Sequence, residues 1–517
     1  MLAKINSGAT VGLDARLVDV EVDIPNEGLP SFTIVGLPDK AVEESRERVR
    51  SAIKNSGADF PTTRITVNLA PADLPKVGPA YDLPIALGIL IADEQIMPIN
   101  EKALFFGELS LDGSLRHTNG ILPMVYMAKK KGIKKVFVPK VNAREASVVG
   151  GVKVYPVETL LELVRYFSGT VTIEPEEKLA LSKLIKSAEA EFDFSEIIGQ
   201  EHAKRAAEIA AAGSHNIYMK GTPGSGKTML ARAIPGILPH LTEEEALEVT
   251  KIYSITGNLG ADQAIVTTRP FRSPHHTTSR IGLIGGGTNP TPGEVSLAHR
   301  GVLFLDEFPE FPRNVLESLR QPMEDGVVTI SRAKATVTYP AQFLLISASN
   351  PCPCGYYGDK KRACKCLPGQ IARYQKRVSG PILDRIDIHV DVPSVDTQKL
   401  IGKDDGNRET SKEIQKRVQR ARDIQTERFK KLNKSKRKKT INSNAEMNTK
   451  LVKTYCPLSS ECRTMMQSAV SSMNLSARSY FKVIKVARTV ADLEGSDEIT
   501  TNHLAEALQY RPKDDGI

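Results

Sequence analysis

The sequence lacks any apolar segment long enough to span a membrane. Its longest apolar run, LPIALGILIA at residues 83–92, falls far short of the roughly 20 residues that a spanning helix needs. Residues 1–18 also lack the charged and then apolar pattern of a secretory signal. We therefore expect a cytoplasmic protein with no membrane partner.

Cysteine is also scarce, with six residues in a chain of 517. So few thiols in a chain expected to be cytosolic argue against a disulfide framework. Hydrophobic residues make up 40% of the chain, which is enough for packed cores and excludes global disorder. The formal net charge of +9 favours an anionic partner such as nucleic acid, although a basic surface that serves only solubility explains it equally well.

The pattern of apolar residues predicts an α/β multi-domain protein. Residues 1–168 alternate strand-like and helical stretches, as in one α+β domain, and residues 169–193 form a Glu- and Lys-rich linker. Residues 194–395 show the strand–loop–helix alternation of a parallel-sheet fold. Residues 396–517 are expected to be helical. They are interrupted by a basic run at 428–444, which we interpret as a flexible solvated segment in preference to a DNA-contacting arm.

A phosphate-binding motif, GxxxxGKT, lies in YMKGTPGSGKTML at 218–230. Its glycines allow a tight turn whose backbone N–H groups point at phosphate oxygens, and a strand-like run precedes it while a helical stretch follows. Lys227 is expected to reach the β- and γ-phosphates of a nucleotide, and Thr228 to offer its hydroxyl to Mg²⁺. The predicted nucleotide contacts come from Gly221, Thr222, Pro223, Gly224, Ser225, Gly226, Lys227 and Thr228.

Polar residues follow two further buried-looking strands. In GVLFLDEF at 301–308, Asp306 is expected to hold Mg²⁺ and Glu307 to polarise the attacking water. The strand FLLISAS ends at Asn350, which is placed to orient that water, although it could equally begin an ordinary polar loop. Together with the phosphate loop, these residues predict a site that hydrolyses a nucleoside triphosphate.

Four of the six cysteines lie within NPCPCGYYGDKKRACKC at 350–366. Thiolates in two such pairs can close a tetrahedral S₄ shell, and we expect a structural Zn²⁺ that stabilises a loop with few apolar residues. Four free thiols in a mobile loop and an iron–sulfur cluster are the alternatives. Basic residues between the ligands would present positive charge to nucleic acid. The expected ligands are Cys352, Cys354, Cys364 and Cys366.

Several motifs together carry a family resemblance. They are RPFRSPHHTTS (269–279), PGEVSLAHRGVLFLDEFPEF (292–311), NPCPCG (350–355), PILDRID (381–387) and SARSYFKVIKVARTVADLEG (476–495). With the phosphate loop they resemble the AAA+ ATPases of the magnesium-chelatase branch, and specifically the YifB/ComM group, over almost the whole chain. The resemblance implies a homo-hexameric ring with ATP between subunits, acting on single-stranded and branched DNA. It implies a helicase or branch-migration motor in recombination during natural transformation, with a recombinase or competence proteins as possible partners.

The resemblance also implies further site residues. Arg385 resembles an arginine finger that reaches a neighbouring subunit's γ-phosphate, with a structural salt bridge to Asp384 or Asp387 as the alternative. Arg478 matches a second sensor that contacts the γ-phosphate of its own subunit from a helical lid at 396–517, with a solvated helix N-terminus as the alternative. Ile198 and Gly199 match the segment beside the adenine, with an ordinary core position for Ile198 as the alternative.

Two insertions of this branch, at 269–290 and 326–340, are expected to form hairpins that face the pore of the ring. Their basic side chains are candidates for contact with the DNA backbone. A metal site at the paired histidines ranks low because no third ligand is apparent. The candidates are Arg272, His275, His276, Arg280, Arg332 and Lys334.

Residues 1–168 resemble a Lon-type protease domain that has lost its Ser–Lys dyad. Ala80 stands at the serine position, and an alanine methyl cannot attack a carbonyl. Leu122 stands where the lysine would follow. We therefore expect this domain to assemble the ring or handle DNA. A chelatase-like metal-insertion ATPase and a non-motor scaffold remain open as alternatives to the DNA motor.

Overall fold

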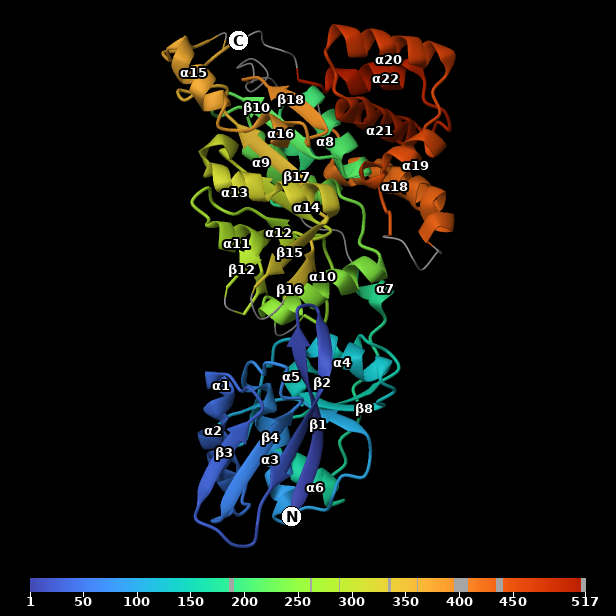
Figure 1. Cartoon of the computed structure of the whole chain (residues 1–517). Coiled ribbons are helices and arrows are strands. Elements are labelled where there is room, and N and C mark those ends of the chain that lie inside the picture. The colour runs from blue at the N-terminus through green and yellow to red at the C-terminus, as the bar shows by residue number, and fades with distance from the viewer. Residues whose placement is uncertain are drawn as a thin grey trace. The chain divides into compact units, whose positions relative to one another are not determined.

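The computed structural model describes residues 1–185, 190–260, 263–287, 289–332, 336–359, 361–394, 408–433 and 440–512 (Figure 1). The chain forms two compact units. One contains Met1–Ile185 and Glu243–Val266, and the other contains Lys186–Thr242 and Thr267–Ile517. This division differs from the expected limits, because helix α10 (Glu243–Thr256) belongs to the first unit although it lies in the sequence between two parts of the second.

The first unit is built on a four-stranded sheet of order β1-β2-β4-β3. The first three strands pair antiparallel, and β3 runs parallel to β4. Val18, Val20 and Val22 alternate with more exposed residues, so one face of β2 is buried. The strands are β1 (Leu2–Val11), β2 (Asp14–Asp23), β3 (Ser31–Val35) and β4 (Arg64–Ala70).

A second sheet in this unit, of order β5-β8-β9, is parallel. Its strands are β5 (Ala103–Phe105), β8 (Lys135–Pro139) and β9 (Lys153–Val157), and a small ladder joins β6 (Glu108–Leu109) to β7 (Leu115–Arg116). The helices are α1 (Lys40–Glu43), α2 (Ser45–Asn55), η1 (Pro79–Tyr81), α3 (Asp82–Ala92), α4 (Ile121–Lys130), α5 (Lys140–Ser147), α6 (Leu160–Phe167) and α7 (Leu181–Leu184).

Both positions expected to have lost the protease dyad lie in the interior of this unit. Ala80 is in the turn η1 and Leu122 is in the first turn of α4, and both side chains are buried. The structure therefore places small or apolar packing residues at these points and offers no nucleophile there.

Helix α10 packs on α4 of the first unit. Its Val249 and Ile252 are fully buried, and the Lys251 ammonium lies 4.2 Å from the centre of the Tyr126 ring. Periodicity in a sequence shows that a helix has a buried face but not which neighbour buries it. For this reason the expected boundaries assigned the helix to the nucleotide-binding core.

The core of the second unit is a five-stranded sheet of order β11-β14-β17-β10-β18, in which every pairing is parallel. This confirms the α/β fold expected for that part of the chain. All residues of β14 and β17 are buried, as in a sheet covered on both faces. The strands are β10 (Ile217–Gly221), β11 (Phe271–Arg272), β14 (Val302–Leu305), β17 (Leu344–Ser349) and β18 (Ile388–Val392).

Helices and turns surround this sheet in the second unit. They are η2 (Phe194–Glu196), α8 (Glu201–Gly213), α9 (Lys227–Ala233), η3 (Ile234–Ile237), α11 (Arg280–Ile284), α12 (Glu294–Leu297), η4 (Phe308–Glu310), α13 (Arg313–Ser318), α14 (Arg320–Asp325), α15 (Pro368–Gln375) and α16 (Gly380–Leu383). Two small ladders join β12 (Gly285–Gly286) to β13 (Thr291–Pro292) and β15 (Val327–Ser331) to β16 (Thr336–Pro340).

The C-terminal part of the second unit is helical. Its elements are α18 (Ser411–Asn433), η5 (Asn444–Glu446), α19 (Thr449–Tyr455), α20 (Ser460–Ser472), α21 (Ala477–Glu494) and α22 (Thr501–Gln509). The basic run interpreted as flexible begins inside α18, where Phe429 is fully buried and Arg428 forms an ion pair with Asp492. That interpretation was wrong for residues 428–433, and residues 434–439 lie outside the described part of the chain.

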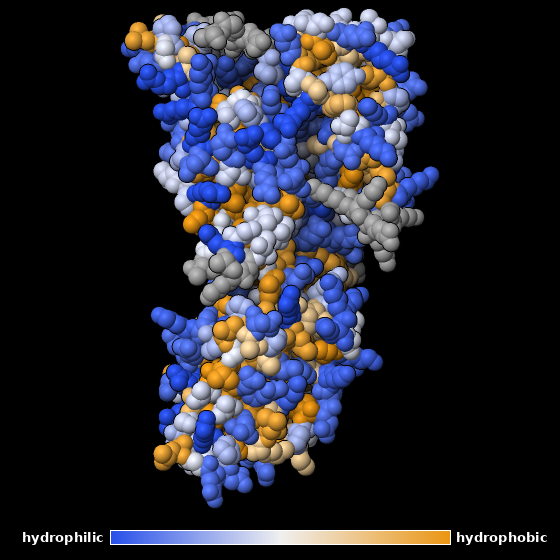
Figure 2. Space-filling model, in the orientation of Figure 1, coloured by the Kyte–Doolittle hydropathy of each residue, from blue (hydrophilic) through white to orange (hydrophobic). Residues whose placement is uncertain are grey.

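Figure 2 shows hydrophilic residues over much of the visible surface, with apolar residues scattered among them. Among the described helices, none is long and apolar enough to cross a membrane.

Candidate nucleotide and metal site

The phosphate loop connects β10 to α9 at the carboxyl edge of the parallel sheet. Gly224 and Gly226 have φ angles of +75° and +92°, a region that favours glycine. A Cβ on Gly221 would lie 2.1 Å from the carbonyl oxygen of Val392, so no side chain fits there. The glycines of the motif are therefore required by the backbone itself.

Lys227 is folded back over this loop. Its Nζ donates to the carbonyl oxygens of Gly221 at 2.7 Å and Thr222 at 2.8 Å, and to Asn350 Oδ1 at 3.3 Å. Burial lowers the pKa of Lys227 to about 8. The structure thus brings the predicted lysine together with the residue that ends the strand β17.

Thr228 and Asp306 meet across the same edge of the sheet. Thr228 Oγ1 donates to Asp306 Oδ2 at 2.8 Å, and the backbone N–H of Glu307 donates to Asp306 Oδ1 at 2.9 Å. A hydroxyl and a carboxylate are hard oxygen ligands of the kind that Mg²⁺ uses beside nucleotide phosphates. The two predicted Mg²⁺ ligands fit that ion in chemistry and in position.

Glu307 follows Asp306 in a left-handed backbone conformation, with a φ of +50°. Such a φ is uncommon for a residue other than glycine and often marks a functional position. The carboxylate Oε2 lies 3.1 Å from Nδ1 of His276, whose ring centre is 4.1 Å from that of His275. His276, expected to contact DNA, therefore lies against the predicted catalytic glutamate.

The other DNA candidates have varied surroundings. Arg272 forms a double contact with Glu294, at 2.6 and 2.7 Å, and is half-buried. Arg280 begins α11 and is exposed, as is Arg332 directly after β15. Lys334 lies outside the described residues. The stretch 326–340 contains the predicted hairpin as β15 and β16, whereas 269–290 contains a short strand, a helical turn and one strand of the β12–β13 ladder.

One carboxylate holds both predicted phosphate-sensing arginines. Glu324 on α14 contacts Arg385 Nη2 at 2.8 Å and Arg478 Nη2 at 3.0 Å. The hydrogen bond from Arg385 is the main reason that the pKa of Glu324 is lowered. The Arg385 side chain is only 8% exposed, whereas that of Arg478 is 58% exposed. No sequence motif pointed to Glu324.

Asp387, one of the alternative partners of Arg385, pairs instead with Lys482 of α21 at 2.9 Å. It also accepts a hydrogen bond from the backbone N–H of Asn216 at 3.2 Å, and His215 Nδ1 lies 3.6 Å away. The segment that carries Arg385 is thereby tied to the helix that carries Arg478.

The predicted adenine-side segment is connected to the phosphate loop. Ile198 is half-buried and Gly199 has a φ of +65°. The next residue, Gln200, donates through Nε2 to the carbonyl oxygens of Ser225 at 3.2 Å and Pro393 at 2.5 Å. Sequence reasoning missed Gln200, although its place directly after the two predicted residues was a signal that could have found it.

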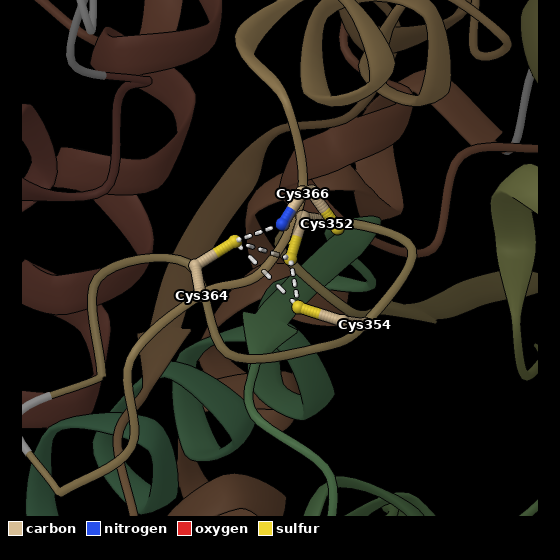
Figure 3. Close-up of side chains that lie close together, drawn as sticks. All are labelled: Cys352, Cys354, Cys364 and Cys366. Carbon is tan, nitrogen blue, oxygen red and sulfur yellow. Dashed lines mark hydrogen bonds between the residues drawn. The ribbon is translucent and has the colours of Figure 1, made fainter.

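The four clustered cysteines converge on one point (Figure 3). Their Sγ atoms all lie within 4.8 Å of one another. The Sγ atoms of Cys352 and Cys354 are 3.4 Å apart, and each of them lies 3.6 Å from that of Cys364. A disulfide would need about 2.05 Å. Four sulfurs about 2.3 Å from a tetrahedral zinc ion are roughly 3.8 Å apart, close to this spacing. The cluster could therefore hold a metal ion.

The four thiols influence one another's pKa. Hydrogen bonds from the backbone N–H groups of Tyr356 and Lys365 lower the pKa of the Cys354 thiol to about 6. The N–H of Cys366 donates to Cys364 Sγ at 3.4 Å, but desolvation and the neighbouring thiols raise the pKa of both Cys364 and Cys366. Metal ions bind deprotonated sulfur, so a bound cation would lower the pKa of these thiols.

Comparison with known proteins identifies the family. The description "Magnesium chelatase, subunit ChlI" matches residues 193–400, "Subunit ChlI of Mg-chelatase" matches 20–142, and "Magnesium chelatase, subunit ChlI C-terminal" matches 408–511. Competence protein ComM of Haemophilus influenzae is 44% identical over 99% of this chain and 97% of its own length. The chain belongs to the ComM/YifB family of magnesium-chelatase-like proteins. YifB of Escherichia coli, another member, is 43% identical over 99% of this chain and 97% of its own.

The ComM/YifB family has an AAA+ core, which suggests ATP and Mg²⁺ as ligands and ATP hydrolysis as the activity. The geometry around Lys227 and Asp306 agrees with both ligands. A Lon protease of Mycoplasmopsis agalactiae is 26% identical over 28% of this chain and 15% of its own length. That shorter likeness is limited to part of the chain and carries no activity over to this member of the family.

Proposed function

We propose that this protein is a hexameric ATPase that acts on DNA as a helicase or branch-migration motor during recombination in natural transformation. The observation that carries the proposal is the assembly of Lys227, Thr228, Asp306 and Asn350 around one phosphate loop. The name of the Haemophilus relative, a competence protein, supports the cellular role. A recombinase or other competence proteins would be its partners.

Each residue of the loop and strand ends has a distinct task in hydrolysis. The loop N–H groups and Lys227 bind the phosphates, while Thr228 and Asp306 hold the Mg²⁺ that neutralises phosphate charge. Lys227 would exchange its present carbonyl contacts for phosphate oxygens, and the added negative charge would raise its pKa again. Glu307 accepts a hydrogen bond from the attacking water, and Asn350 orients it.

The two arginines are proposed to serve one phosphate together. They share Glu324, so whichever nucleotide Arg385 reaches lies near Arg478 as well. This differs from the expected division of labour, in which Arg385 serves a neighbour and Arg478 its own subunit. Two guanidinium groups would stabilise the charge that develops on the transferred phosphoryl group.

DNA is proposed to contact the exposed cations of the two insertions. Arg280, Arg332 and His275 are the described candidates that are exposed, and the two arginines carry a permanent positive charge. Such contacts neutralise backbone phosphates without reading sequence, which suits a motor that moves along any strand. The formal net charge of +9 is consistent with this partner.

The four clustered cysteines are proposed to bind a structural Zn²⁺.

Branch migration on a synthetic three- or four-strand DNA junction tests the motor. We expect the intact protein to move the junction when ATP is present and its ATPase to rise with DNA. Lys227→Ala should abolish nucleotide binding, whereas Glu307→Gln should bind ATP but turn it over at least about a hundred-fold more slowly. Normal turnover by either variant would contradict the site assignment.

A metal-insertion ATPase is the second candidate, because the matching descriptions name a magnesium chelatase subunit. The same samples separate the two functions. No junction movement, together with an ATPase rate that ignores DNA, would reject the motor and favour a chelatase-like role or a scaffold. Junction movement by the intact protein, and none by Lys227→Ala, would reject both the metal-insertion ATPase and the scaffold.

A further inference from the structure

The cysteine cluster lies directly beside the predicted nucleotide site in the chain. Asn350, which contacts Lys227, is separated from the fully buried Cys352 by a single proline. The position of the first metal ligand is therefore coupled, through one conformationally restricted residue, to the position of the residue predicted to orient the attacking water.

The cluster loop also packs on the phosphate loop. Gly355, the residue after Cys354, has a φ of +85°. A Cβ placed on it would lie 2.5 Å from Cγ and 2.6 Å from Cδ of Pro223. Pro223 lies within the phosphate loop itself. Gly355 is therefore required both by its backbone conformation and by close contact with the nucleotide-binding backbone.

Apart from the cysteines, the contacts within this loop are local. Between Asn350 and the start of α15 at Pro368, the described residues form no helix or strand, and half of them are exposed. Asp359 accepts from the backbone N–H groups of Lys361 and Arg362, and Arg362 donates to the Tyr356 hydroxyl. A hydrogen bond from Gln375 Nε2 to the carbonyl oxygen of Pro351, at 3.2 Å, links the loop to α15. A tetrahedral metal would join the two ends of the loop and fix Gly355 against Pro223.

We propose that a zinc ion bound by Cys352, Cys354, Cys364 and Cys366 is a structural part of the ATP site, holding Asn350 and the phosphate loop in their binding arrangement. This proposal rests on the proposed ATPase function. It gives the zinc a role in nucleotide binding that is separate from any contact of the basic loop residues with DNA. Loss of zinc should therefore weaken ATP binding in the absence of DNA.

Zinc content and affinity for a fluorescent ATP analogue, measured with Mg²⁺ and without DNA, test the proposal. The intact protein should contain about one zinc per chain. The double variant Cys364→Ser/Cys366→Ser should lose it, and its affinity for the analogue should fall at least about ten-fold because the site is no longer held in place. Circular dichroism and thermal unfolding show whether the variant is folded, and chelation of the folded intact protein should give the same loss of affinity.

Two glycines of the loop provide a matched pair. Gly355→Ala should keep the zinc but lose affinity for the ATP analogue, because its Cβ collides with Pro223. Gly358→Ala introduces the same kind of strain, since the φ of Gly358 is +79°, but its Cβ would meet no atom within 4 Å. Gly358→Ala should therefore keep both zinc and affinity.

The outcomes separate the two proposals. If the intact protein binds the ATP analogue no better than Lys227→Ala does, the proposed function is overturned, and this inference with it. Tight analogue binding by zinc-free folded protein, or an intact protein that never takes up zinc, would overturn the inference alone. So would equal analogue affinities for Gly355→Ala and Gly358→Ala. A parallel triple variant, Lys361→Ala/Arg362→Ala/Lys365→Ala, should lower DNA affinity only, and a loss of analogue affinity there would contradict the separation of roles.

Discussion

At the scale of single residues, the groups predicted to bind phosphate are contacted by side chains from other segments of the chain. Lys227 and Asn350 are brought together as expected from a phosphate loop beside a neighbouring strand end. Glu324 and Gln200 belong to no motif. Glu324 contacts arginines at least 61 positions later in the chain, and Gln200 contacts a residue 25 positions later. Such support is visible only when distant segments have been placed against each other.

Glu324 offers a test of this supporting layer. We expect Glu324→Gln to lower the kcat of ATP hydrolysis about ten-fold, with a much smaller change in KM, because Arg478 loses the carboxylate that orients it. Steady-state ATPase kinetics measure both constants.

Glu317→Gln is the matched control for Glu324→Gln. Glu317 lies one helix earlier, on α13, and pairs with Arg320 at 3.0 Å, whereas Glu324 pairs with Arg385 and Arg478. An unchanged kcat in Glu324→Gln, or an equal loss in Glu317→Gln, would show that Glu324 does not position the arginines.

At the scale of elements, Asp387 joins parts of the second unit that carry the two arginines. It lies directly before β18, pairs with Lys482 of α21 and accepts from Asn216 at the start of β10. The positive charge of Lys482 holds the pKa of this buried carboxyl far below its usual range. Relative to its protonated form, the ionised carboxyl is therefore favoured much more strongly in the folded protein than in the unfolded chain.

We expect Asp387→Asn to lower the free energy of unfolding by about 3 kcal/mol or more at pH 7, because it leaves the buried Lys482 ammonium without its anion. A folded pKa below the unfolded value of about 3.9 adds stability above that pH and loses it as the pH falls. The gap between the intact protein and the variant should therefore narrow below about pH 4.

Thermal unfolding over a range of pH measures this gap. Asp384→Asn is the control, since Asp384 lies three positions earlier and is exposed. A gap of constant size at every pH, or one equally large for Asp384→Asn, would contradict the buried charge pair.

At the scale of the whole molecule, a segment that lies in the sequence between two parts of the second unit belongs to the first unit. Residues 243–266 leave the sequence of the ATPase core and complete the first unit. Within that unit, the Ser254 hydroxyl of α10 is hydrogen-bonded to the buried carboxylate of Glu145 on α5. The core and the first unit are therefore connected by three crossings of the chain, and the first unit is not a simple N-terminal appendage.

Ile252→Ala in the first unit and Ile237→Ala in the second unit test this assignment in the full-length chain. Both side chains are fully buried, and they lie fifteen positions apart in sequence but in different units. Each truncation should cost about 2–5 kcal/mol, in the unit that buries it. Hydrogen exchange should show lost protection in α4 and α10 for Ile252→Ala, and in α8 and β10 for Ile237→Ala. The reverse pattern, or equal loss of protection in both units, would contradict the assignment of α10 to the first unit.

The amino-acid sequence alone predicts the nucleotide site, the parallel core and the cysteine cluster. These features depend on local spacing: a glycine-rich turn between strand and helix, carboxylates at a strand end, and paired thiols in a short loop. Four other features become visible only in the folded chain: His276 contacts Glu307, Glu324 contacts both arginines, Gly355 packs on Pro223, and α10 belongs to the first unit. Each of these is a contact between segments distant in the chain, and the residue types involved are compatible with many other partners.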